Sequence, residues 1–307
     1  MVVLVIDKLL RSSKPLLTLS RLFLFVLFLF VLLVFFVVIE VINVLVWWSV
    51  FVFMDLVFIF VCKGCSFSSI LNYYVLQECL GLLFLVFISS SLQGLIVMVK
   101  MGLLPFHYWL YVVVGGLKYW MLMWFLTMQK LPFIGVLMML LVNLFFWFLV
   151  FGFFVCYFQL FLVKDYKFIL VLNSTESFNW ILIGYMFSFF NGLLLFLYYF
   201  FLSCYMIPFF GDESKFDYEW LVIFFYVNIP LGVPFFVKFF VVGFVFSYYY
   251  IWFLLVLFFL FINFMALSVW LFLKSIESNV FFSKVGGFFY MIYGLFFVLL
   301  LYHFSKS

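Results

Sequence analysis

The sequence has 307 residues, of which 71% are hydrophobic and only 8% are charged. An ordinary soluble domain is roughly 45–50% apolar and about 25% charged, and too few charges are present here to cover a soluble fold. The formal net charge of +4 is small and the basic residues are spread along the chain. This pattern excludes nucleic acid as a partner and indicates an integral membrane protein.

The apolar runs are long enough to be transmembrane helices. Such a helix needs ~20 apolar residues, so a chain of this length holds about ten or eleven of them with short connections. The runs over residues 22–39 and 286–302 are apolar on every side, whereas a β-barrel strand alternates apolar and polar residues. We therefore expect an all-α integral membrane fold, a polytopic bundle forming one transmembrane domain over residues 1–307, with a polar N-terminal tail over residues 1–18.

The expected spans in chain order are 19–40, 43–62, 69–90, 92–115, 119–134, 136–160, 167–189, 191–210, 219–245, 249–274 and 286–304. The polar breaks between them are short. None of the breaks is long enough to form a soluble catalytic domain.

Charged residues inside the expected spans are the most informative feature. An ionisable side chain at membrane depth costs about 2.5–3.5 kcal/mol on insertion scales and marks a functional site by default. Asp55 is flanked by apolar residues and needs a cationic or hydrogen-bonding partner, for which Lys100 is the natural candidate. The glutamates Glu40, Glu78 and Glu176 lie near helix ends or polar neighbours, which favours an interfacial or structural role.

Two of the spans are expected to be interrupted helices that each carry a lysine. Lys100 is followed closely by Gly102 and Pro105, and a proline removes a helical hydrogen bond and can break the helix. The segment Asn228–Lys238 contains two prolines and a glycine just ahead of Lys238. A broken helix at membrane depth is tolerated only where it is buried in protein or lines a water-filled cavity. The pattern therefore indicates a hydrated ion path.

Two further residues are candidates for proton transfer. Lys130 precedes Leu131 and Pro132, and it either belongs to the ion path or snorkels to the interface from a helix end. His107 directly follows the expected break and can exchange protons near neutral pH, although a hydrogen-bonded packing histidine is an equally good interpretation.

The sequence contains no motif for a cofactor or metal. Cys62 and Cys65 have the spacing of a zinc or redox site, but a matching second pair is missing, so a loop that holds two thiols is favoured. A glycine-rich nucleotide motif, a cysteine cluster for iron–sulfur and histidine pairs for haem are also missing. We expect no cofactor-binding and no metal site on this chain.

Two strings resemble subunit 2 of mitochondrial NADH dehydrogenase, respiratory complex I. They are Lys100–Trp109, reading Lys-Met-Gly-Leu-Leu-Pro-Phe-His-Tyr-Trp, and Trp124–Pro132, reading Trp-Phe-Leu-Thr-Met-Gln-Lys-Leu-Pro. The upstream string Asn72–Gln77 resembles the Lys-Tyr-Phe-Leu-X-Gln string of the same family. Recognisable matches run from about Asp55 to Lys238, and Asp55 stands where the family commonly has glutamate.

This family belongs to the antiporter-like pump subunits, and the resemblance implies a proton path through Asp55, Lys100, Lys130 and Lys238. It also implies that the chain is a core membrane-arm subunit of NADH:ubiquinone oxidoreductase, with other membrane-arm subunits and the bilayer, including cardiolipin, as partners. NADH, FMN, iron–sulfur clusters and ubiquinone are then expected on other subunits. The implied location is the mitochondrial inner membrane, and the phenylalanine-rich, arginine-poor composition resembles products of T-rich mitochondrial genomes.

Two other functions remain open from the residues alone. A cation/proton antiporter subunit would use the same lysines without NADH or quinone. A structural membrane subunit would carry the lysines as inert scaffolding, either sealed by packing or reaching the lipid headgroups.

Overall fold

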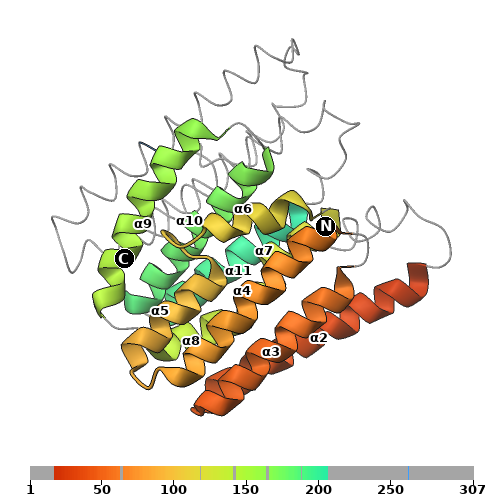
Figure 1. Ribbon diagram of the computed structural model, residues 1–307, viewed down its shortest axis with the longest axis horizontal. Coiled ribbons are helices and arrows are strands. Elements are labelled where there is room, and N and C mark those ends of the chain that lie inside the picture. Colours follow the sequence, from red (N-terminus) through yellow and green to blue (C-terminus); the bar gives the residue numbers. More distant parts are fainter. Residues whose placement is uncertain are drawn as a thin grey trace, which may run out of the picture. The chain divides into compact units, whose positions relative to one another are not determined.

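The computed structural model describes residues 17–62, 65–117, 119–140, 143–163, 166–187, 189–206 and residue 262. All regular elements in these residues are helical, as predicted. The expected spans 219–245 and 286–304 lie outside the described residues, and so do Lys238 and the span 249–274 apart from residue 262. The helices, shown in Figure 1, are α2 (Leu17–Glu40), α3 (Val44–Val61), α4 (Phe67–Val86), α5 (Ser90–Met101), α6 (Tyr108–Gly115), α7 (Tyr119–Leu126), η1 (Met128–Lys130), α8 (Leu131–Leu140), α9 (Asn143–Leu162), α10 (Tyr166–Phe187) and α11 (Phe189–Met206).

Three helical segments of the described part are long and apolar enough to cross a membrane: Val44–Val61, Phe67–Val86 and Trp120–Leu140. In the first two, 33% and 28% of the residues in the apolar window are buried, against 89% in the third. The third segment is therefore surrounded by other parts of the protein. The other two segments expose apolar side chains, as helices that face lipid or another membrane protein do.

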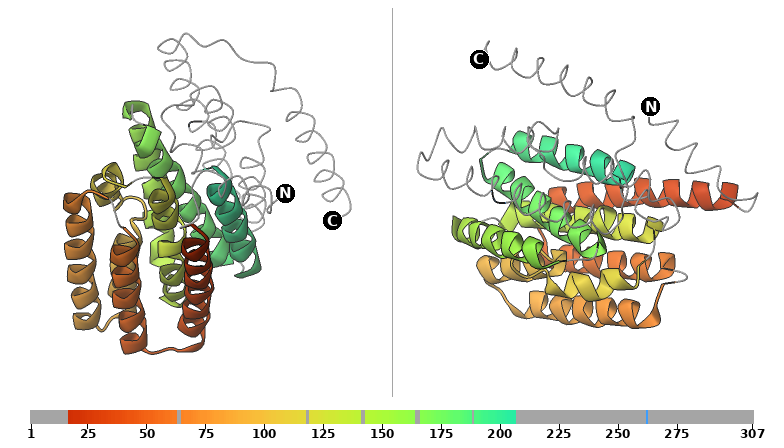
Figure 2. Two further views of the ribbon diagram at one scale, coloured as in Figure 1. Left: turned by 90° about the vertical axis from the view of Figure 1, so that its right-hand side faces the viewer. Right: turned by 90° about the horizontal axis from the view of Figure 1, so that it is seen from above.

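The described residues fall into two compact units. Of these residues, 17–102, 106–145 and 203–206 belong to the first unit, and 103–105 and 146–202 belong to the second. In the first unit, α2, α3, α4 and α5 follow one another with short connections, and each packs against the next (Figure 2). Helix α8 packs against α2, α3 and α5, which makes it the inner layer of this unit.

The expected interruption after Lys100 is confirmed. Helix α5 ends at Met101, and the chain becomes helical again at Tyr108. Gly102 ends α5, because its φ of +65° lies in the left-handed region, where glycine is the favoured residue. The helix thus stops before it reaches Pro105, so the glycine and not the proline sets the position of the break.

The expected helix boundary between residues 134 and 136 is wrong. Helix α8 runs without a break from Leu131 to Leu140. A Cβ atom on Gly135 would lie 3.1 Å from Cγ1 of Val38 on α2. Gly135 therefore permits close packing of α8 on α2, which is a common use of small residues between membrane helices.

The second unit contains α10 packed against α9 and α11. The rings of Phe153 on α9 and Trp180 on α10 lie 4.9 Å apart, and those of Phe178 on α10 and Tyr199 on α11 lie 4.8 Å apart. A Cβ atom on Gly184 would lie 3.4 Å from the Cα atom of Gly192. Facing glycines thus bring the backbones of α10 and α11 close together.

Candidate functional site

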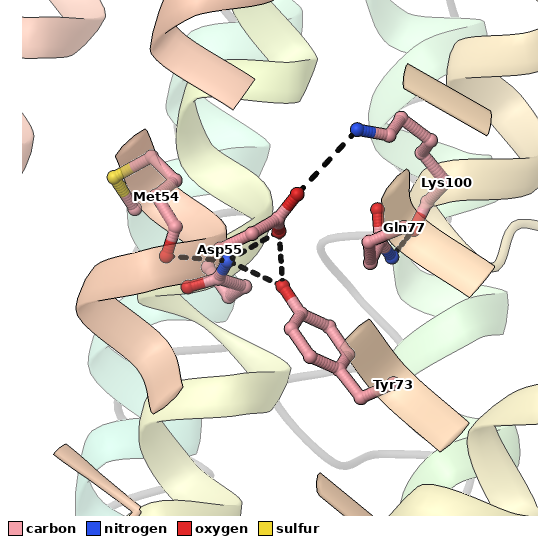
Figure 3. Close-up of polar contacts among 6 residues, drawn as sticks. Met54, Asp55, Tyr73, Gln77 and Lys100 are labelled. Atoms are coloured by element: carbon pink, nitrogen blue, oxygen red, sulfur yellow. Dashed lines mark hydrogen bonds and ion pairs between the residues drawn. The ribbon is translucent and has the colours of Figure 1, made fainter. Parts of the chain in front are cut away.

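Asp55 and Lys100 form a buried ion pair in the first unit. The Nζ atom of Lys100 lies 3.6 Å from Oδ2 of Asp55, and both side chains are only 1% exposed. Figure 3 shows Asp55 pointing from α3 toward Lys100, which comes from the last turn of α5. The predicted partnership of these two residues is therefore confirmed.

The other oxygen of Asp55 is held by two neutral hydrogen-bond donors. The hydroxyl of Tyr73 on α4 donates to Oδ1 of Asp55, and Nε2 of Gln129 in η1 lies 3.3 Å from the same oxygen. Gln129 Nε2 also lies 2.7 Å from the Tyr73 hydroxyl and 3.1 Å from the carbonyl oxygen of Met54. Three helical elements thus fix the position of the carboxylate.

The Lys100 ammonium is enclosed by aromatic rings on its other sides. Its Nζ lies 4.8 Å from the ring centroid of Phe51 on α3 and 5.5 Å from that of Phe133 on α8. Ring faces attract cations at these distances. A Cβ atom on Gly81 would lie 3.6 Å from the same Nζ, so α4 approaches the lysine with its backbone.

The last carbonyl groups of α5 receive donors from two neighbouring helices. Nε2 of Gln77 on α4 donates to the carbonyl oxygen of Lys100 at 3.0 Å, and Nε1 of Trp109 on α6 donates to that of Val99 at 3.0 Å. Carbonyls at the end of a helix lack intrahelical partners and must be satisfied when the helix ends inside a protein. The break after Lys100 is therefore stabilised by side chains.

Some buried polar atoms around the pair have no hydrogen-bond partner in the part of the chain that the structure describes. They include Oε1 of Gln77, Oε1 of Gln129 and Nε1 of Trp48. A Cβ on Gly81 would lie 3.5 Å from Trp48 Nε1, so this indole points into the space beside Lys100. Internal water is the usual partner of such atoms, which gives the site the capacity for hydration.

Lys130 is buried in the first unit rather than snorkelling to an interface. It ends η1, in the middle of the apolar segment Trp120–Leu140, and is 3% exposed. Its backbone amide donates to the carbonyl oxygen of Thr127. The snorkelling alternative depended on a helix end after Ile134, and this end does not exist.

His107 is fully buried at the start of α6. Its Nε2 lies 3.2 Å from the hydroxyl of Tyr111, and its ring stacks on Tyr108 at a centroid distance of 5.0 Å. These aromatic contacts fit a hydrogen-bonded packing histidine and also place a titratable ring next to a hydroxyl group. The two cysteines Cys62 and Cys65 are free thiols, and no group of three or more potential metal-ligating residues occurs within the described ranges.

Of the two roles expected for Glu176, interfacial or structural, the interfacial one is wrong. Glu176 is 0% exposed and lies in the middle of α10, in the second unit. Tyr157 and Trp180 both donate hydrogen bonds to its Oε1, each at 3.2 Å. A structural role for this carboxyl is compatible with these contacts.

Three residues of the Asp55 network were not singled out by sequence reasoning: Tyr73, Gln77 and Gln129. A detectable signal was present for two of them. Tyr73 and Gln77 are four residues apart in an apolar span, which places both side chains on one helix face. A search for paired polar residues at this spacing would have found them.

The Tyr73 hydroxyl holds two buried partners, Asp55 and Gln129. We expect Tyr73→Phe to lower the free energy of unfolding by about 1–3 kcal/mol, because buried Asp55 and Gln129 each lose a hydrogen bond. Thermal unfolding of the assembled protein in detergent measures the effect. Tyr74→Phe is the matched control, since Tyr74 lies on the same helix and is 42% exposed. Equal stability of the two variants would contradict a supporting role for the hydroxyl.

These features define a class: a helical membrane protein with a buried carboxylate–lysine pair at the end of a broken helix. No protein-family model matches the chain. It is 48% identical over 192 residues to NADH-ubiquinone oxidoreductase chain 2 of Ascaris suum, which covers 62% of this chain and 64% of the relative. It is 40% identical over 239 residues to NADH-ubiquinone oxidoreductase chain 2 of Caenorhabditis elegans, which covers 77% of this chain and 85% of the relative. The chain belongs to the family of NADH-ubiquinone oxidoreductase chain 2.

Proposed function

We propose that this chain is a membrane-arm subunit of respiratory complex I that moves protons across the mitochondrial inner membrane. The observation that carries the proposal is the ion pair of Asp55 and Lys100, buried at 3.6 Å beside a broken helix. Next to it, polar atoms of Gln77, Gln129 and Trp48 have no hydrogen-bond partner within the described ranges, which supports a water-containing path. The names of the two relatives support the membership in an NADH–ubiquinone oxidoreductase.

In the proposed mechanism, Asp55 keeps a proton on Lys100 while the two groups are in contact. An opposite charge within ~4–6 Å favours the charged form of both partners, whereas burial in a medium of low dielectric constant disfavours it. Separation of Nζ from the carboxylate removes the favourable contribution and leaves the unfavourable one. Lys100 then releases its proton toward Lys130.

The later steps use Lys130 and Lys238. Lys130 is the second buried lysine of the first unit and accepts the proton in this scheme. Lys238 lies outside the described residues and is proposed as the exit group, with His107 as an additional proton-exchanging group near the break. NADH oxidation, FMN, iron–sulfur clusters and ubiquinone reduction belong to other subunits, which supply the driving force. The complete bundle of about ten or eleven helices, with the second interruption before Lys238, is part of the same proposal.

The proposed partners are the neighbouring membrane-arm subunits and the bilayer, including cardiolipin. Exposed apolar side chains on the described helices provide the surface for such contacts, among them Leu33, Phe36, Phe60 and Val86. A cation/proton antiporter subunit is the alternative function. It would exchange protons for cations in vesicles without NADH or quinone, whereas the proposed subunit would not.

The test is proton pumping by the complete complex carrying Asp55→Asn, reconstituted in liposomes. We expect the number of protons pumped per NADH oxidised to fall, because the neutral amide keeps the shape of the carboxylate but cannot hold Lys100 charged. Glu40→Gln is the control, since it removes an equally charged group that is exposed at the end of α2. Unchanged pumping by an assembled Asp55→Asn complex would show that the Asp55–Lys100 pair has only a structural role.

A further inference from the structure

Glu176 is a buried carboxyl group that the proposed path does not use. It lies in the middle of α10 with Asn173 three residues before it and Asn179 three residues after it. Residues at this spacing share one side of a helix. All three side chains are at most 3% exposed, so α10 carries a buried polar stripe through an apolar helix.

The hydrogen bonds of Glu176 are suited to both protonation states. Tyr157 Oη and Trp180 Nε1 donate to the same oxygen, Oε1. This oxygen accepts hydrogen bonds in an ionised carboxylate and equally as the carbonyl oxygen of a neutral carboxyl group. A proton can therefore bind at Oε2 or leave it without breaking either bond.

The two asparagines have buried polar atoms without hydrogen-bond partners among the described residues. Within the described part of the chain, Oδ1 and Nδ2 of Asn173 and Oδ1 of Asn179 have no hydrogen-bond partner. Nδ2 of Asn179 donates to the carbonyl oxygen of Leu149 on α9 at 3.4 Å. Gly152 allows this approach, because a Cβ atom there would lie only 2.9 Å from the Asn179 amide nitrogen. Buried polar atoms of this kind are the usual binding partners of internal water.

We propose that the packed helices α9 and α10 form a second proton-binding site, with Glu176 as the group that binds the proton and with internal water held by Asn173 and Asn179 as its route of delivery. The proton forms an O–H bond at Oε2 of Glu176 when it arrives as hydronium or from a neighbouring water, and it returns to water when it leaves. No oxidant or reductant takes part. This inference rests on the proposed proton transport and extends it to the second unit of the chain.

The experiment compares the complete complex carrying Glu176→Gln with the complex carrying Glu40→Gln. The glutamine keeps an acceptor oxygen for Tyr157 and Trp180 but cannot exchange a proton. Loss of an acid–base group slows proton transfer by about 100-fold or more, so we expect NADH-driven pumping to collapse in Glu176→Gln and to stay normal in Glu40→Gln. Infrared difference spectra between the oxidised and the NADH-reduced complex should lose a carboxyl C=O band only in Glu176→Gln.

Normal pumping by an assembled Glu176→Gln complex would overturn the inference. Lost pumping with an unchanged carboxyl band would also overturn it, because the role would then be structural. If Glu176→Gln does not assemble, Tyr157→Phe replaces it: removing one donor should move the band to higher frequency, and an unmoved band rejects the assignment. The two proposals can be separated. If Asp55→Asn pumps normally while Glu176→Gln loses both pumping and the carboxyl band, the path through Asp55 is rejected and the proton-binding site at Glu176 is retained.

Discussion

Lys100→Met should abolish proton pumping by the complex while NADH oxidation becomes slow or uncoupled. Methionine matches the length and flexibility of the lysine stem but carries no proton, so the transfer step from the ion pair has no donor. Proton pumping per NADH oxidised in liposomes measures the effect. Lys167→Met, at the start of α10, is a matched control that removes a lysine outside the proposed path.

The same substitution should also destabilise the first unit. It leaves Asp55 buried without its counter-charge, and breaking a buried ion pair by removing one partner costs about 3–5 kcal/mol. The double variant Asp55→Asn with Lys100→Met removes both charges and should recover much of the stability but none of the pumping. Recovery of both would show that the pair is structural, and normal pumping by Lys100→Met alone would contradict the proposed mechanism.

Gly102→Ala should destabilise the first unit, because it combines backbone strain with a close contact to a buried side chain. At φ +65° an L-residue is strained by about 1–2 kcal/mol, and the new Cβ would lie 2.6 Å from Cδ1 of Leu110. Leu110 is fully buried, so the contact adds about 1–3 kcal/mol of overpacking. We therefore expect a total loss of about 2–5 kcal/mol, measured by thermal unfolding and by the yield of assembled complex.

Gly115→Ala provides the control for this prediction. A Cβ atom on Gly115 would meet no atom within 4 Å, and its φ is not in the left-handed region. We expect this variant to assemble with wild-type stability. Similar yields of Gly102→Ala and Gly115→Ala would show that the end of α5 tolerates a different backbone conformation.

The Asp55–Lys100 pair could be predicted from the sequence because each charge needs a partner at membrane depth and few charges are available. The break in the helix was also predictable, because Gly102 and Pro105 both interrupt an α-helix. The sequence did not identify which of the two residues ends α5. That depends on the packing of Leu110 and on donors from α4 and α6, which come from distant positions in the chain.

The position of Glu176 could not be predicted in the same way. Its neighbours Ser174 and Thr175 make the sequence locally polar, which is compatible with either an interfacial or a structural role. In the structure they donate to the carbonyl oxygen of Val171 on their own helix, at 2.8 Å and 3.0 Å. Such local bonds let small polar residues stay inside an apolar helix. Polarity in the sequence therefore did not correspond to exposure.

The expected boundary near residue 135 failed for a related reason. A glycine between two apolar stretches resembles a helix end, but Gly135 serves as a contact point for Val38 and Phe35 on α2. Whether a glycine ends a helix or allows a neighbouring helix to pack closely depends on which residues lie against it. This information is not local in the sequence.

The backbone at the end of α5 is held by hydrogen bonds that do not involve the Lys100 side chain. The amide of Gln77 holds the Lys100 carbonyl and the indole of Trp109 holds the preceding one, so two neighbouring helices clamp the backbone from which the lysine extends. Displacement of the helix would break both of these bonds, whereas rotation about the carbon–carbon bonds of the lysine breaks neither. The backbone of Lys100 is thus held in place while its side chain keeps rotatable bonds. The length of that side chain limits how far the ammonium group can move.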